Sequence, residues 1–182
     1  MDFLIDSNSY LRIAKTINPL LGQPFGPDRY KLLIHSFCDA EIDKCSRLKS
    51  KFTWVNESCF INNRKKSHIK IANHLGNEII RIASHINTYK RISFRSISDA
   101  DIISLSTARV LDINLITDDP GLLAAACEFE IKFLKTIEFL NYLCTNKIIN
   151  DAKLLEVYEC SEYHIDHLKV YRSDHKNHFP HL

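Results

Sequence analysis

The chain has 182 residues, of which 45% are hydrophobic and 25% are charged. This length allows one domain with a sizeable core, and this composition excludes a chain that is disordered throughout. The formal net charge is only +2, which excludes the strongly basic character typical of nucleic-acid-binding domains, so any contact with a polyanion has to come from local patches.

Cysteine spacing and the apolar runs indicate the compartment. The 6 cysteines form no C-x-x-C pair, and several lie within apolar patterns, as free buried thiols do. No apolar run is long enough to span a bilayer, and residues 1–6 carry an acid where a signal peptide has a basic region. We therefore expect a cytoplasmic protein without structural zinc and without membrane contact.

In the first part of the chain, short apolar strands precede amphipathic helices. The expected elements are a strand at 3–5, a helix over about 8–16, a loop over 18–28, a strand at 31–35 and a helix from 36 toward 51. Ser36 is the expected N-cap of the last helix, with Asp39 as the acid of a capping box. Residues 52–63 show no clear periodicity.

The rest of the chain repeats this alternation. The expected elements are a long helix over 66–87, a helix over 102–111, a strand at 114–117, a helix over 121–128, a strand at 131–134, a helix over 136–143 and an amphipathic stretch over 154–170. Ser98 is the expected N-cap for Asp101 three residues on, and Asp119 directly precedes Pro120 at a helix start. Short apolar strands separated by helices predict an α/β fold, with a mostly parallel sheet covered on both faces.

Acidic residues lie near the predicted strand ends and helix starts. Asp6 ends the first strand, and Asp119 follows the strand at 114–117 by two residues. Glu41 and Asp101 lie in the first turns of two helices. In an open parallel sheet, ligands bind outside the carboxyl ends of the strands, so these four acids can converge at one edge.

A cluster of carboxylates is repulsive and is stable only when cations neutralise it. Oxygen ligands favour Mg²⁺ or Mn²⁺ over zinc, and such an ion can activate water and stabilise the charge on a phosphate. The 4 glycines cannot supply a Walker-type loop, and no Ser/His/Asp or Cys/His arrangement competes. We therefore predict phosphodiester hydrolysis at a site formed by Asp6, Glu41, Asp101 and Asp119.

Each acid also has a purely structural interpretation. Asp119 can be only an N-cap, and Asp101 only the acid of a capping box. Glu41 can be only a solvated helix residue. Asp6 is harder to explain in this way, because an acid at the end of a buried strand needs compensation, either from Asn8 or from a metal ion.

Four short motifs carry these acids: FLIDSN at 3–8, SFCDAEID at 36–43, DIISLSTA at 101–108 and LITDD at 115–119. In order and spacing they resemble the motifs of the PIN domain (PilT N-terminal) family of metal-dependent nucleases. The first and fourth match the family's hydrophobic-D-[ST]-N and hydrophobic-hydrophobic-T-[ND]-D patterns, whereas the second is weak alone. The resemblance covers roughly residues 1–143.

The resemblance implies a three-layer α/β/α sandwich with a five-stranded mostly parallel sheet. The nuclease domain would span 1–143 with a helical middle segment at about 52–95, and 144–182 would form a helical extension with a polar, His-rich tail. The four acids would hold Mg²⁺ or Mn²⁺, with Asn8 and Thr117 as supporting polar groups. Asp118 stands where the family often has Asn. Asp99 also sits at a helix start, but spacing and the Ser98 cap favour Asp101.

Basic and aromatic residues of the middle segment are candidates for RNA contacts. The candidate phosphate ligands are Arg64, Lys65, Lys66, Arg91 and Arg95, and the candidate base-stacking rings are Phe52, Trp54 and Phe60. The alternative is a solvated loop with core aromatics. In the tail, histidines spaced by three can bind a transition metal, or the tail can be a polar, partly disordered terminus.

The leading hypothesis is a Mg²⁺- or Mn²⁺-dependent endoribonuclease. By analogy with many small PIN proteins, it would act as a toxin or in phage defence. The expected partners are an RNA substrate, an antitoxin or other protein, and a second copy of the chain. The alternatives are a PIN-like module that binds RNA or protein without cutting, and a DNA nuclease of related fold.

Overall fold

The computed structural model describes residues 2–17, 20–93, 97–163 and 169–180. The elements follow in the order β1 (Phe3–Ile5), α1 (Ser7–Ile17), β2 (Pro24–Phe25), β3 (Tyr30–Ile34), α2 (Ser36–Lys44), α3 (Ser46–Lys51), the 3-10 helix η1 (Thr53–Asn56), α4 (Ser58–Lys66), α5 (Asn73–Ser93), α6 (Asp99–Leu111), β4 (Asn114–Ile116), α7 (Pro120–Glu128), β5 (Phe133–Leu134), α8 (Thr136–Thr145), α9 (Asp151–Tyr163) and α10 (Lys169–His178).

The strands form one five-stranded sheet in the order β2-β3-β1-β4-β5. Strand β1 lies at its centre and pairs in parallel with β3 and β4, so that Leu4 stands between Leu33 and Leu115. Strand β5 extends the parallel part, and only the short edge strand β2 is antiparallel. The predicted α/β fold with a five-stranded, mostly parallel sheet is confirmed.

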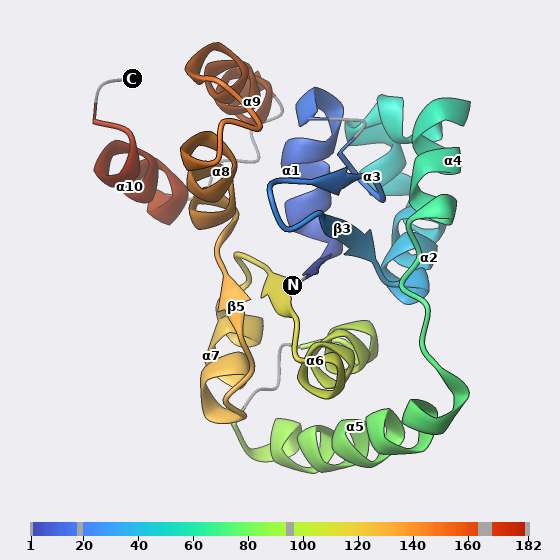
Figure 1. Ribbon diagram of the computed structural model, residues 1–182. Coiled ribbons are helices and arrows are strands. Elements are labelled where there is room, and N and C mark those ends of the chain that lie inside the picture. Colours follow the sequence, from blue (N-terminus) through green and yellow to red (C-terminus); the bar gives the residue numbers. More distant parts are fainter. Residues whose placement is uncertain (1, 18–19, 94–96, 164–168, 181–182) are drawn as a thin grey trace.

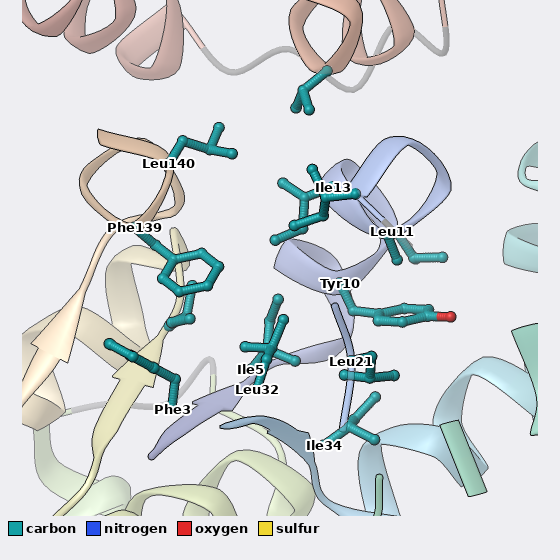
Figure 2. Packing of buried hydrophobic residues seen from close by; sticks show 14 of the residues in the cluster. Phe3, Ile5, Tyr10, Leu11, Ile13, Leu21, Leu32, Ile34, Phe139 and Leu140 are labelled. Carbon is teal, nitrogen blue, oxygen red and sulfur yellow. The ribbon is translucent and has the colours of Figure 1, made fainter. Parts of the chain in front are cut away.

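Helices cover both faces of the sheet (Figure 1). Because side chains alternate along a strand, Phe3 and Ile5 face one core and Leu4 faces the other. The first core lies among α1, α2, α8 and α9, and the second among α5, α6 and α7. Figure 2 shows the first core, where the rings of Phe3 and Phe139 have centroids 5.2 Å apart. Burial on both faces explains why β1 is apolar throughout.

The middle segment differs from the prediction. A single helix is expected over 66–87, but residues 67–72 are not helical. Helix α4 ends at Lys66, and α5 begins only at Asn73. Between them the backbone pairs with β3: Ile34 N–H donates to the Ser67 carbonyl, and Ile69 N–H donates to the Ile34 carbonyl. These bonds to the sheet replace the helical bonds that an unbroken helix would need at this point.

Three further details of the prediction are corrected. The loop expected over 18–28 contains β2, which pairs with the start of β3. The helix expected from 36 toward 51 breaks at Cys45, which ends α2 and begins α3. His35, not Ser36, is the N-cap of α2, since its Nδ1 accepts from the N–H of Phe37.

The C-terminal region packs onto the sheet domain. Helix α9 lies against α1 and α10 lies against α8, and Leu154, Val157 and Phe179 are buried in the first core. The polar tail expected near the C-terminus is therefore helical over Lys169–His178. His164, His167 and His181 lie outside the described residues. Among the described helices, none is long and apolar enough to cross a membrane.

Candidate active site

A pocket of about 570 Å³ opens at the edge of the sheet where β1 and β4 end. All four predicted acids, Asp6, Glu41, Asp101 and Asp119, line it. They come from four separate stretches of sequence, and the parallel strand order brings them together as predicted. Asn8, the predicted supporting polar group, also lines the pocket.

The hydroxyl of Thr117 connects Asp6 with Asp119. It donates to Oδ2 of Asp6 at 2.5 Å and accepts from the backbone N–H of Asp119 at 3.1 Å. The other Asp6 oxygen, Oδ1, accepts from the backbone N–H of Ser9 in the first turn of α1. Asp119 caps α7 through Oδ1, which accepts from Leu122 N–H. Both carboxylates are thus held in fixed orientations.

Two serine hydroxyls position Glu41. Ser7 donates to Oε2 at 2.9 Å, and Ser98 donates to Oε1 at 3.3 Å. Ser7 is the first residue of α1, and Ser98 is the N-cap of α6. Glu41 therefore joins α2 to both neighbouring parts of the pocket. The sequence does not predict these two contacts, because Ser7 stands out only as part of the FLIDSN motif and Ser98 only as an N-cap.

Asp101 and Asp99 have different surroundings. Asp101 forms the predicted capping box with Ser98: its Oδ2 accepts from Ser98 N–H, and its own N–H donates to the Ser98 hydroxyl. The side chain of Asp99 is 95% exposed and pairs with Lys90 at 3.3 Å. Of the two, only Asp101 lines the pocket, which agrees with the choice of Asp101 from the spacing of the motifs.

Burial raises the pKa of Asp6 from 3.8 to about 6, although hydrogen bonds from Thr117 and Ser9 oppose the shift. The pKa of Asp101 is also raised, chiefly by burial and in part by the negative charge of Asp119. Carboxyl groups with raised pKa values in a pocket are typical of functional sites. The positive ends of α1, α6 and α7 offset some of the repulsion, and a bound cation would offset more.

Asp118 does not line the pocket. Its Oδ2 pairs with Arg12 at 2.7 Å, and its Oδ1 accepts from the N–H of Thr136 at the start of α8. The structure therefore assigns Asp118 to the attachment of α1 and α8. Its negative charge still contributes to the raised pKa of Asp6, although much less than burial does, so Asp118 acts on the site electrostatically while it is paired with Arg12.

Of the predicted phosphate ligands whose side chains the structure describes, none lines this pocket. Arg64 is fully buried, and its Nε donates to Oδ1 of Asp39 at 2.6 Å. It therefore cannot contact RNA, and that prediction is wrong. Lys65 and Lys66 are exposed at the end of α4. The side chain of Arg91 and all of Arg95 lie outside the described residues.

The predicted base-stacking rings belong to the core. Phe52, Trp54 and Phe60 are all buried in the first core cluster, and the rings of Trp54 and Phe60 have centroids 4.6 Å apart. These rings pack α3, η1 and α4 together, so the alternative of core aromatics is confirmed. The pocket itself offers Lys44 as a cation and Leu48 and Leu122 as apolar walls, which the sequence did not mark.

The oxygen-only set of acids suits Mg²⁺ or Mn²⁺. Among the described residues, no three His, Cys, Asp or Glu side chains lie close enough together to enclose a metal ion by themselves. Mg²⁺ does not need such an enclosure, because it usually keeps several waters and is held by one or two carboxylates. The carboxylates that line the pocket are the type of ligand that an ion bound in this way would use.

Comparison with known proteins gives a limited result. No family model and no curated protein matches the sequence. The crystal structure of FitAcB from Neisseria gonorrhoeae is similar in backbone, with a TM-score of 0.48 and 15% identity over 74% of this chain and 97% of that chain.

Proposed function

We propose that the protein is a PIN-like, Mg²⁺- or Mn²⁺-dependent endoribonuclease. The observation that carries the proposal is the meeting of Asp6, Glu41, Asp101 and Asp119 in one pocket at the carboxyl edge of a parallel sheet. A structural role explains each acid alone as a cap or a helix residue, but it does not explain why all four line the same pocket.

The hydrogen-bond network supports a site that is organised before a ligand arrives. Thr117 fixes the Asp6 carboxylate, and Ser7 and Ser98 fix both oxygens of Glu41. Groups that hydrogen-bond to metal-binding carboxylates in this way orient them. Removing such a group commonly lowers metal affinity or activity about 10- to 100-fold. A bound Mg²⁺ or Mn²⁺ would activate water and stabilise the charge that develops on the phosphate.

Other residues of the pocket suit a nucleotide strand. Lys44 can contact a phosphate, and Leu48 and Leu122 supply apolar walls for a base or sugar. The volume of about 570 Å³ is that of a small-ligand site. It accommodates about one nucleotide unit, which favours single-stranded or locally unpaired RNA.

The direct test is cleavage of a fluorescent single-stranded RNA by the purified protein with Mg²⁺ or Mn²⁺. We expect cleavage with metal, none with excess chelator, and a loss of at least about 100-fold in Asp6→Asn. Asp99→Asn is the matched control, because Asp99 is an exposed acid just two residues from Asp101. It should keep wild-type activity.

The same assay separates the alternatives. Faster cleavage of DNA than of RNA of equal sequence would favour a DNA nuclease of related fold. RNA binding without cleavage under any metal would favour a non-catalytic binding module. Equal loss of activity in Asp6→Asn and Asp99→Asn would show that the pocket is not the site of chemistry.

We further propose, on the resemblance to small PIN proteins, that this nuclease acts as a toxin or in phage defence, restrained by an antitoxin or other protein partner. Growth arrest on expression of the wild type, but not of Asp6→Asn, is the expected result. Light scattering of the purified chain would show a homodimer or a monomer. Cell fractionation would test the expected cytoplasmic location.

A further inference from the structure

A second pocket, of about 480 Å³, lies near the amino ends of the strands. Asp2 precedes β1 and lines it, whereas Asp6 follows β1 and lines the acidic pocket. A strand rises about 3.3 Å per residue, so the two pockets are about 13 Å apart along β1. This second pocket, which we call the basic pocket, is therefore distinct from the proposed nuclease site.

The charge of the basic pocket is opposite to that of the acidic pocket. Three exposed lysines line it, namely Lys31, Lys66 and Lys70, against a single acid, Asp2. Part of the Asp2 charge is already engaged, because its Oδ1 accepts from the backbone N–H of Lys31 at 2.9 Å. Three lysine cations thus surround one cavity, although the net charge of the whole chain is only +2.

His68 also lines the basic pocket, and its imidazole ring is held in place by Asp39. Its Nε2 lies 2.8 Å from Oδ2 of Asp39, and Asp39 is itself buried and paired with Arg64. With Nε2 engaged in this way, Nδ1 is the ring nitrogen that can meet a ligand. The ring is 31% exposed, so a molecule in the pocket can reach it.

The remaining wall of the basic pocket is apolar. Leu33, Ile69, Leu111 and Ile113 line it, and all four belong to or pack against the second core. A free inorganic anion gains nothing from apolar contacts. A phosphate joined to a sugar and base can place the sugar or base against this apolar wall. The volume is that of a small-ligand site and is too small for a duplex.

We propose that the basic pocket binds one phosphate-bearing nucleotide unit, with the phosphate among Lys31, Lys66 and Lys70 and the base or sugar on the apolar wall. Lysines bind phosphate through charge-assisted hydrogen bonds, which are stronger than neutral ones. The unit can be a free nucleotide or the phosphorylated end of a nucleic-acid strand. This binding does not depend on cleavage or on a metal ion.

The test is equilibrium binding to the full chain in excess chelator, which removes any metal-dependent contribution of the acidic pocket. The probes are adenosine 5′-monophosphate and a short RNA that carries either a 5′-phosphate or a 5′-hydroxyl. We expect the phosphorylated probes to bind, and Lys66→Ala/Lys70→Ala to weaken them about tenfold or more, since bonds to charged groups are worth that much.

A matched control is available next to Lys66. Lys65 and Lys176 are exposed but do not line the basic pocket, so Lys65→Ala/Lys176→Ala removes the same charge elsewhere. Equal weakening by both double variants would overturn the proposal in favour of nonspecific charge attraction. Binding abolished by Asp6→Asn but not by the lysine changes would also overturn it.

The probes distinguish the two sources of the phosphate. Equal affinity for the mononucleotide and the 5′-phosphorylated RNA would support a free nucleotide as a sufficient ligand. Binding of the 5′-phosphorylated RNA alone would support a strand end. Equal affinity for 5′-phosphate and 5′-hydroxyl RNA, with no binding of the mononucleotide, would contradict a phosphate pocket of this kind.

Discussion

Thr117 donates a hydrogen bond to the buried carboxylate of Asp6 across the junction between β1 and β4. These residues are 111 positions apart in the chain. Because the same hydroxyl accepts from the N–H of Asp119, it sets the relative position of the two acids that follow the central strands. Changes at Thr117 should therefore affect the site without removing a carboxylate.

We predict that Thr117→Val lowers metal-dependent cleavage about 10- to 100-fold. Removing a group that hydrogen-bonds to a metal-binding carboxylate commonly has an effect of this size. The valine has nearly the same shape but cannot donate to Asp6, and it leaves the Asp119 N–H without its acceptor. Thr107→Val is the control, because the Thr107 hydroxyl is buried without a described partner. A similar loss in both variants would mean that general packing, not the hydrogen bond, matters.

The raised pKa of Asp6 predicts a pH dependence of stability. The folded pKa is about 6 and the unfolded value is 3.8, so the folded state holds the proton more tightly. The stability that this group contributes is fully present below pH 3.8 and is lost as the pH rises through 6. At pH 8 the metal-free protein should be less stable by up to about 3 kcal/mol on this account.

Asp6→Asn should therefore raise the unfolding temperature of the metal-free protein at pH 8 and have little effect near pH 3.5, because it removes the charge that burial disfavours. Thermal unfolding followed by circular dichroism across this range measures the difference. Asp99→Asn should show no such pattern, since Asp99 is exposed. A destabilised Asp6→Asn at pH 8 would contradict the prediction.

Metal binding should appear as stabilisation. A ligand that binds only the folded state stabilises it by about 3 kcal/mol at 100 times its dissociation constant. We predict that Mn²⁺ or Mg²⁺ raises the unfolding temperature of the wild type and has much less effect on Asp6→Asn or Asp119→Asn. Ca²⁺ and Na⁺ at equal ionic strength serve as controls. An identical rise in all variants would place the metal elsewhere.

Local sequence was sufficient to predict the parts of the site whose partners lie within a few residues. The Ser98–Asp101 capping box and the Asp119–Pro120 helix start both formed as expected. Their physical causes, a side chain accepting from an N–H three residues on and a proline that needs no N–H, are visible in the sequence itself.

Long-range partners explain what the sequence did not predict. Asp39 follows Ser36 by three residues, as a capping-box acid should, but it pairs with Arg64, which is 25 positions away. That pairing leaves His35 as the cap and removes Arg64 from the surface. Likewise, Glu41 is fixed by serines 34 and 57 positions away, and no local pattern indicates them.

The pair of Arg64 with Asp39 yields a stability prediction. Arg64 also donates to the Val55 carbonyl, so Arg64→Met removes the donor of that carbonyl and the cation on Oδ1 of the buried Asp39, and leaves His68 as the remaining partner of Oδ2. Breaking one side of a buried ion pair costs about 3 to 5 kcal/mol. Urea unfolding should show this loss, whereas Lys65→Ala should change stability by less than about 0.5 kcal/mol. A small loss in Arg64→Met would mean that water or His68 compensates Asp39.

Two glycines yield opposite predictions for the same substitution. Gly22 has φ +72°, and a Cβ there would lie 2.3 Å from the Ser67 hydroxyl, which already donates to the Asn63 carbonyl. Gly22→Ala therefore strains the left-handed backbone and displaces the segment that pairs with β3, at a cost of about 2 kcal/mol or more. Because Gly22 lines the basic pocket, as do Lys66 and His68 on either side of Ser67, nucleotide binding should weaken as well.

Gly76 lies within α5, and a Cβ there meets nothing within 4 Å. Gly76→Ala should therefore stabilise the protein by up to about 1 kcal/mol, since alanine is the better helix former. Urea unfolding of both variants measures the contrast. Similar losses at both positions would show that the turn at Gly22 tolerates a side chain as readily as the helix does, and that Ser67 can move away from β3 without penalty.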